Sequence, residues 1–525
     1  MFFGNVSLVR ASCRNRPLYT SSFRLADVTR TPNTSSLING KWEAVVGLEI
    51  HAQINSLTKL FSGSPTSFNE LVNTNVSVID AAFPGVLPRL NAKCVDLAIK
   101  TSLALNADIH LRSSFDRKHY FYPDLPQGYQ ITQHYEPIST GGQIALTELD
   151  GAAQAIKVRI EQLQLEQDTG KSLHDLGPGR TLVDLNRAGT GLMEIVTMPD
   201  IRSSFEAGLV MRKLQTLLRC VGSSNGNMEE GSMRCDVNVS VHEVGTPFGT
   251  RCEIKNLNSV RFVTMAIDAE IRRHIEVLEQ GGNIIQETRG YDVMANKTFW
   301  LRNKETAPDY RYMPEPDLPT LILSQSYVDS LRASLPELPD DRRVRIIHQY
   351  ALNVHDANVL LGEAGGIEYF EAVCKGRDPR SVVNWMTHEL FGQLAARAIP
   401  FHRCPVSPEQ LGSLVDAVKG RLISGTIGKN VLAVMVDGDV RPAELIVEEK
   451  EWGVVGDADA LRRVCEELVA RNQDKVDIIR GGNPKLFIWF VGQAMRETKG
   501  RADPVLLNTV LEDVIGVGKD GNKMK

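Results

Sequence analysis

The first extended segment of the chain alternates apolar and polar side chains with a period of two. Every even position from 44 to 54 is apolar, whereas the odd positions include Glu49 and His51. Successive side chains of a β-strand point to opposite faces of the sheet. The pattern therefore predicts a half-buried strand over residues 43–54, with Glu49 and His51 on one face.

A second strand is predicted over residues 156–168, and its alternation changes phase. Apolar residues occupy even positions up to 160 but odd positions at 163 and 165, so the pattern slips by one near Glu161. A β-bulge, which inserts one extra residue into a strand, would explain the slip. It would also leave Gln164, Glu166 and Asp168 on one polar face.

Residues 233–241 and 251–255 predict two more strands that carry charge on one face. The charged positions are Arg234 and Asp236 in the first segment, and Arg251, Glu253 and Lys255 in the second. The four strands together predict a β-rich domain with a shared polar surface.

Helical periodicity dominates the rest of the chain. Residues 262–280 space apolar side chains at helical intervals, and residues 326–402 are mostly helical in pattern. Four prolines between 308 and 319 break regular structure, and Ser407, followed by proline and then by Gln410, forms a helix start with a capping box. The chain is thus expected to be α+β, with domains at 42–320, 321–404 and 405–525.

Composition narrows the class of protein. One core fills roughly 250–300 residues, so a chain of 525 residues predicts two or three domains. No apolar run approaches the roughly 20 residues of a membrane helix, so no membrane span is expected. The net charge of −5 gives no overall basic field, so any RNA contact must be a local patch. The eight cysteines lack a C-x-x-C pair, which indicates reduced thiols rather than disulfides or a zinc site.

The amino terminus has the composition of a mitochondrial presequence. Residues 1–26 contain four arginines and several serines but no acidic residue, and they lack the unbroken apolar core of a secretory signal. We therefore expect a presequence over residues 1–25, a mature chain in the mitochondrial matrix, and a fold that begins near Trp42. An ordinary unstructured tail is the alternative.

Carboxylates and one imidazole on the predicted strands form the main candidate for chemistry. These residues are Glu49, His51, Glu166, Asp168, Asp236 and Glu253. Such a set could hold a magnesium ion, mainly through oxygen ligands, and the ion would neutralise nucleotide phosphates. Alternatively, the polar stripes are the solvated outer face of an antiparallel sheet.

Other sequence signals exclude some chemistries. Gly170-Lys171-Ser172 ends like a P-loop, but Leu165 stands where its first glycine is required. A second partial match fails because Asn430 replaces the metal-binding Ser or Thr. An ATP site in this chain would therefore not be a P-loop. Since there is no G-x-S-x-G elbow either, nothing predicts a serine nucleophile.

Residues 117–124 set three basic-type side chains beside three aromatic ones. This combination suits phosphate contact and base stacking. The alternative is a proline-terminated surface loop whose rings pack inward.

Several motifs in one order resemble the B-subunit family of the glutamyl/aspartyl-tRNA amidotransferases, in its mitochondrial form. The matching segments are 46–53, 116–124, 229–236, 255–259, 309–317 and 491–500. The resemblance implies a β-rich catalytic cradle, a helical domain and a small all-α YqeY-like tail domain that binds tRNA.

The resemblance also implies an activity, that of a glutaminyl-tRNA synthase (glutamine-hydrolysing), a carbon–nitrogen ligase with glutamine as amido donor. ATP would phosphorylate the γ-carboxyl of glutamate on misacylated tRNA(Gln), and ammonia would displace the phosphate. The implied cofactors are ATP and Mg2+. The implied partners are a glutaminase A subunit, a small third subunit and Glu-tRNA(Gln).

Roles carry over from the family to matching positions. The resemblance implies that Glu49, His51, Glu166 and Asp168 are catalytic residues. Arg234 and Lys255 are added as the candidate cations that would meet negative charge developing on the transferred group. The implied metal ligands are Glu49, His51, Glu166 and Glu253, and the implied nucleotide- and tRNA-end-binding residues are Lys118, Tyr120, Tyr122 and Asp236.

One position departs from the family. Its members commonly have two adjacent glutamates where this chain has Glu166 and Gln167. A neutral amide is a weaker magnesium ligand, so a ligand of the family would be missing or water-mediated. Two other classes stay open: a non-catalytic tRNA-binding scaffold and a free-standing metal-dependent hydrolase.

Overall fold

The fold is taken from a computed structural model of the chain. The described residues are 38–66, 68–173, 180–303, 310–453, 458–481, 485–498 and 500–516. The presequence expected over residues 1–25 lies outside them.

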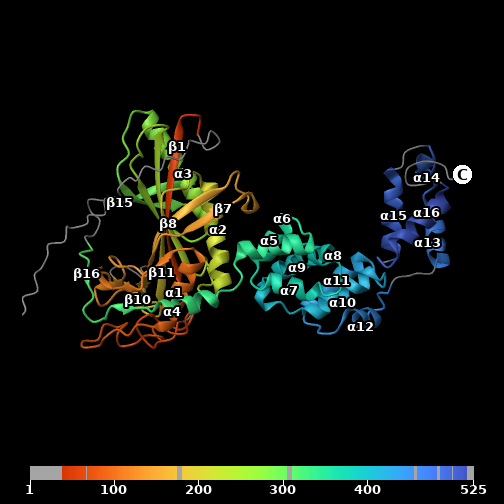
Figure 1. Cartoon of the computed structure of the whole chain (residues 1–525). Coiled ribbons are helices and arrows are strands. Elements are labelled where there is room, and N and C mark those ends of the chain that lie inside the picture. The colour runs from red at the N-terminus through yellow and green to blue at the C-terminus, as the bar shows by residue number, and fades with distance from the viewer. Residues whose placement is uncertain are drawn as a thin grey trace, which may run out of the picture.

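A large sheet forms the first part of the protein (Figure 1). The strand order is β15-β14-β13-β12-β1-β11-β8-β6-β2, and β7 pairs with β8 beside this path. The strands are β1 (Trp42–Gln53), β2 (Asp108–Ile109), β6 (Ser139–Thr140), β7 (Gln143–Leu146), β8 (Ile156–Gln167), β11 (Gly191–Thr197), β12 (Met233–Glu243), β13 (Cys252–Leu257), β14 (Glu287–Asp292) and β15 (Lys297–Asn303).

The register of this sheet confirms the four predicted strands and the bulge. In the pairing of β8 with β11, Gln162 lies opposite Val196 and Ile160 lies opposite Thr197, which leaves Glu161 as the extra residue. Every strand that pairs with β1 or with β8 does so antiparallel. The bulge therefore brings both halves of β8 into phase with the rest of the sheet.

Three helices cover the apolar face of the sheet: α1 (Ala92–Ala104), α2 (Ser204–Val221) and α3 (Val260–Glu279). Leu48 and Ile50 of β1 share one hydrophobic core with Val210 of α2 and Ile267 of α3. The even positions of β1 therefore face the helices, and the odd positions face away from them. α3 confirms the helix predicted over residues 262–280.

Short strands surround the opposite face. β4 (Asp116–His119) pairs with β5 (Tyr129–Thr132) and with β16 (Met313–Pro314), while β3 (Arg112–Ser113) pairs with β17 (Leu321–Ile322). β9 (Lys171–Leu173) and β10 (Leu182–Asp184) pair antiparallel in a separate two-stranded sheet. Because β16 and β17 return to the first domain, the proline-rich segment extends this domain rather than ending it.

The hydrophobic cores divide the chain differently from the boundaries expected at residues 320 and 404. The first core reaches Leu331 in α4 (Gln325–Ala333), which packs on α1. The second core runs from Ile346 to Val447, and the third from Leu461 to Ile515. The second core crosses residue 404 because the helix that starts at Ser407 packs on the preceding helices.

The second and third cores are helical, so the fold is α+β as predicted (Figure 1). The second contains α5 (Pro339–Tyr350), α6 (Val354–Gly362), α7 (Gly366–Val373), α8 (Pro379–Asn384), the π-helix Trp385–Leu390, α9 (Phe391–Ala396), α10 (Pro408–Lys419), α11 (Gly425–Val436) and α12 (Ala443–Glu449). The third contains α13 (Ala458–Arg471), α14 (Gln473–Arg480), α15 (Lys485–Glu497) and α16 (Pro504–Ile515).

The described residues bear on two expectations from composition. All seven cysteines among them are free, and five of these are buried. No helix in the described part of the chain is long and apolar enough to span a membrane.

Candidate active site

The polar face of the large sheet lines a cavity of about 1330 Å³. Strands β1, β8, β11, β12 and β13 all contribute side chains to it, and Tyr310 and Tyr312 line it as well. Glu166, Asp168 and Glu194 on this face are each less than 10% exposed. The alternative of a solvated outer sheet face is therefore wrong.

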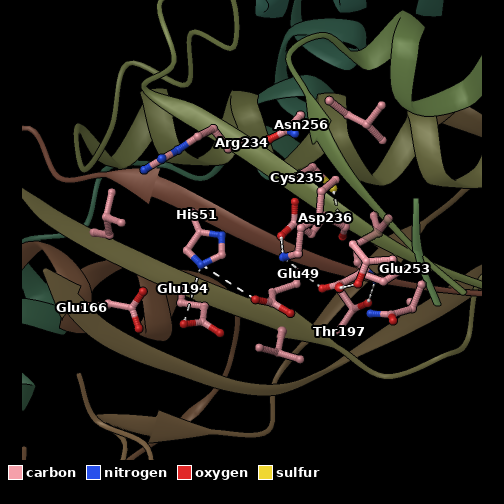
Figure 2. A pocket seen from close by; sticks show the side chains of 18 of the residues that line it. Glu49, His51, Glu166, Glu194, Thr197, Arg234, Cys235, Asp236, Glu253 and Asn256 are labelled. Carbon is pink, nitrogen blue, oxygen red and sulfur yellow. Dashed lines mark hydrogen bonds and ion pairs between the residues drawn. The ribbon is translucent and has the colours of Figure 1, made fainter. Parts of the chain in front are cut away.

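An acidic group surrounds His51 on the floor of the cavity (Figure 2). His51 lies directly opposite Glu194 in the pairing of β1 with β11. Its Nε2 atom is 3.8 Å from Glu49 Oε1 and 3.7 Å from Glu194 Oε2. These three side chains converge from adjacent strands, so the predicted pair Glu49 and His51 gains a third member.

Glu194 was not among the site residues predicted from the sequence. It is the single charged residue of strand β11, in which only Thr197 is otherwise polar, and that isolation was the available signal. Burial, together with the neighbouring carboxylates Glu166 and Glu49, raises the pKa of Glu194 well above its usual range. Its Oε2 atom accepts a hydrogen bond of 2.8 Å from Gln164, so the side chain is held in place.

Glu166 and Lys118 form an ion pair beside this group. Lys118 Nζ lies 3.4 Å from Glu166 Oε2, and Gln130 donates a hydrogen bond of 3.3 Å to the other oxygen. Burial alone would raise the pKa of Glu166, but Lys118 and His51 more than offset this and lower it. Burial opposes the charge of Lys118 as well, yet Glu166 and Glu194 raise the pKa of Lys118 well above its usual value.

The group around His51 fits a divalent cation. The donor atoms of Glu49, His51 and Glu194 all lie within 4.8 Å of one another. An Mg–O distance of about 2.1 Å places adjacent ligands about 3 Å apart and opposite ligands about 4.2 Å apart. The observed separations of 3.7 and 3.8 Å lie between these values. Lys118 pairs closely with Glu166, whereas the ion pairs of Glu49 and Glu194 are with His51, so a cation would balance negative charge in this group.

Glu253, by contrast, lies outside this group. Lys255 Nζ contacts Glu253 at 3.0 Å and Asp236 at 2.5 Å, and Thr288 donates a hydrogen bond of 3.0 Å to Glu253. The structure therefore places Glu253 and Asp236 as the counter-ions of Lys255 and not beside His51. Burial opposes the charge of Lys255, but these two carboxylates outweigh it and raise its pKa.

Asp168 pairs with Arg234 across the strands. Arg234 Nη2 lies 2.7 Å from Asp168 Oδ2, Arg187 lies 3.6 Å from the same oxygen, and Gln53 donates a hydrogen bond of 3.2 Å to it. Burial raises the pKa of Asp168, but the two guanidinium groups outweigh burial and lower it. Asp168 is thus an ionised carboxylate that positions the cavity residue Arg234.

Only part of the basic and aromatic segment 117–124 faces the cavity. Lys118 and Tyr120 line it, and Tyr120 stacks on Tyr122 with ring centroids 4.4 Å apart. Tyr122 itself lies outside the lining and is 51% exposed. Arg117 is bound to Glu315 through two hydrogen bonds of 2.8 and 2.9 Å, so its guanidinium is occupied.

Gln167 does not replace a ligand in the cavity. The alternation of β8 turns it away from Glu166, and Gln127 donates a hydrogen bond of 2.8 Å to its side-chain oxygen. The backbone N–H of Ile131 donates to the same oxygen at 3.3 Å. Gln167 is therefore a packing residue between β8 and β5, and its neutrality leaves the acidic group intact.

The match to protein-family models covers most of the chain. The GatB/GatE catalytic domain model matches residues 44–329, which include the whole cavity, and the GatB domain model matches residues 368–515. The fold and the site thus define a tRNA amidotransferase subunit with a catalytic β-domain and a helical extension.

Bacterial relatives match this chain over nearly their whole length. The B subunit of the aspartyl/glutamyl-tRNA(Asn/Gln) amidotransferase from Methylobacterium sp. (strain 4-46) is 49% identical over 91% of this chain and 97% of its own. The proteins of the same name from Methylorubrum extorquens and Paramagnetospirillum magneticum are each 48% identical, over 93% and 91% of this chain and 100% and 98% of theirs. The chain belongs to the B-subunit family of the aspartyl/glutamyl-tRNA amidotransferases.

Proposed function

We propose that this chain is the B subunit of a mitochondrial glutamyl-tRNA(Gln) amidotransferase. ATP transfers its terminal phosphate to the γ-carboxyl of glutamate on tRNA(Gln) and leaves as ADP. Ammonia from a glutaminase A subunit then displaces the phosphate and gives glutaminyl-tRNA(Gln) for mitochondrial translation. A small third subunit completes the complex. The basic, acid-free composition of residues 1–25 supports the mitochondrial matrix as the location.

The observation that carries this proposal is one cavity that holds both a convergent acidic group and three cationic side chains, each paired with a carboxylate. Glu49, His51 and Glu194 converge on its floor, while Arg234 reaches it from the neighbouring strand β12 and Lys118 from β4 of a separate small sheet. Phosphoryl transfer needs little covalent chemistry from a protein, because positioning and electrostatic stabilisation supply most of the rate. The two cations, with Lys255, are placed to meet negative charge that develops on the transferred group.

Glu49, His51 and Glu194 would hold the magnesium ion, and Glu166 keeps Lys118 charged and oriented. When bound, the ion neutralises phosphate charge on ATP. The remaining work falls to residues of this chain. Asp168 holds Arg234 in place, and Asp236 and Glu253 hold Lys255, so each cation has a fixed position before the substrates arrive.

The decisive experiment copurifies the chain with its glutaminase partner and measures ADP formation with and without Glu-tRNA(Gln). We expect ADP formation that requires the charged tRNA and disappears in His51→Ala. His348→Ala is the matched control, because His348 is exposed on α5, far along the chain from the cavity. Replacing Glu-tRNA(Gln) by Asp-tRNA(Asn) tests the choice of substrate. A wild-type complex that forms no ADP would leave a tRNA-binding scaffold as the function.

A further inference from the structure

Aromatic side chains form a wall at the end of the cavity where Lys118 lies. The wall consists of Tyr120, His134, Tyr310 and Tyr312, all of which line the cavity. His134 and Tyr312 stack with ring centroids 3.8 Å apart and an interplanar angle of 8°. Tyr310 stands edge-on to Tyr312 at 6.0 Å. Lys118 Nζ lies 5.3 Å from the centroid of the Tyr310 ring.

The position of this wall is fixed by contacts that do not involve the rings. β16 follows Tyr310 and Tyr312 directly and pairs with β4. Glu315 is buried and accepts two hydrogen bonds from Arg117, and the backbone N–H of His119 donates 2.9 Å to the carbonyl of Tyr310. The rings therefore keep their place without being packed into a core.

Lys118 connects the wall to the acidic group. Its ammonium lies between the Tyr310 ring and Glu166, which is 3.4 Å away. Aromatic faces stack on nucleobases, and a lysine ammonium binds phosphate as a point charge. A nucleotide whose base lies on the wall would thus carry its phosphates toward Lys118 and toward the carboxylates around His51.

We propose that the wall is a stacking site for an adenine ring, with Tyr310 as its principal face. This inference rests on the proposed function, which brings two adenosines to the cavity: the nucleoside of ATP and the 3′-terminal adenosine of the tRNA. Stacking on a π-face suits either source, because no hydrogen-bond pattern of the base is required.

Direct binding to the full-length chain tests the proposal. The probes are ATP and AMP, measured by titration calorimetry, and tRNA(Gln) with and without its 3′-terminal adenosine, measured by filter binding. Tyr310→Leu keeps apolar volume but removes the π-face, and Tyr310→Phe keeps the ring. We expect Tyr310→Leu to weaken binding of one adenine probe by about 5- to 150-fold, the range for loss of one stacked base, and Tyr310→Phe to stay within about twofold.

The two sources of adenine give different outcomes. Loss of ATP and AMP affinity identifies the nucleotide, whereas loss of the advantage of intact over truncated tRNA identifies the acceptor end. If Tyr310→Leu and Tyr120→Leu both bind every probe as the wild type does, with unchanged melting temperatures, the proposal is overturned. Wild-type binding of an adenine probe that Tyr310→Leu weakens, without any ADP formation by the complex, would refute the proposed function and still support this stacking site.

Discussion

Replacement of Glu194 by glutamine should stabilise the protein in the absence of divalent cations. The pKa of Glu194 is raised in the folded chain by burial and by Glu166 and Glu49. Below pH 4 this carboxyl is protonated in both states and makes no difference to folding. As the pH rises above the ordinary glutamate value of about 4.3, the unfolded chain ionises first, so the folded state loses stability. Glu194→Gln removes that loss and keeps the acceptor for Gln164.

The expected gain at pH 7.5 is about 2 kcal/mol, the scale for replacing a buried, poorly compensated charge by a neutral group. Glu166→Gln is the matched control and should have the opposite sign. At the observed 3.4 Å, an effective dielectric constant of about 20 gives an attraction to Lys118 of about 5 kcal/mol, of which burial cancels a part. We expect Glu166→Gln to lose about 2–3 kcal/mol, because it leaves Lys118 without its nearest counter-ion.

Urea unfolding in EDTA at pH 5 and at pH 7.5 measures both changes. The Glu194→Gln gain should grow with pH and the Glu166→Gln loss should persist at both values. Added Mg2+ should then stabilise the wild type more than Glu194→Gln, since binding to the folded state alone adds stability. If both variants shifted stability in the same direction, the electrostatic account of the cavity would be refuted.

Three further outcomes follow from contacts outside the cavity. Lys59→Met should lower the free energy of unfolding, measured with denaturant, by about 3–5 kcal/mol. The fully buried Lys59 ammonium lies 2.9 Å from Asp80, so the substitution leaves that carboxylate without its counter-ion. A second substitution, Asp80→Leu, should restore most of the lost stability. Arg343→Met removes a 2.7 Å contact to Asp150 that joins α5 to the first domain, so calorimetry should resolve the two domains into separate transitions, and a single unchanged transition would contradict this role. Truncation after residue 453 removes the third core as a unit and should raise KM for tRNA with little change in turnover at saturation; an unchanged KM would exclude a tRNA-binding role for α13–α16.

Local periodic signals allowed the predictions that succeeded. The alternation of β1 placed Glu49 and His51 on one face, and the phase slip at Glu161 located a bulge that the strand register confirms. The capping box at Ser407 could also be predicted, because it depends on a few neighbouring residues. In all of these cases the physical cause lies within one strand or one turn of the chain.

Features that depend on the pairing of segments far apart in the chain could not be predicted from local patterns. The return of β16 to β4, which extends the first domain and places Tyr310 in the cavity, joins residues about 200 positions apart. In the sequence, Glu194 stands out only as one charge in an apolar run. It joins the site because the antiparallel pairing of β1 with β11 places it directly opposite His51. Glu253 lies on its predicted face beside Lys255, but the pairings of β13 with β12 and of β12 with β1 bring it level with Gly47, four residues along β1 from His51.

The acidic group thus has an arrangement that folding alone does not favour. Burial and like charge raise the pKa of Glu194, whereas Lys118 can serve only one carboxylate closely and lies beside Glu166. A protein selected for stability alone would place an amide or an apolar side chain at position 194, since that would remove the repulsion. Strained electrostatics of this kind persist at functional sites where a bound charge relieves them, and the raised pKa of Glu194 is therefore a physical reason for the cation proposed at this group.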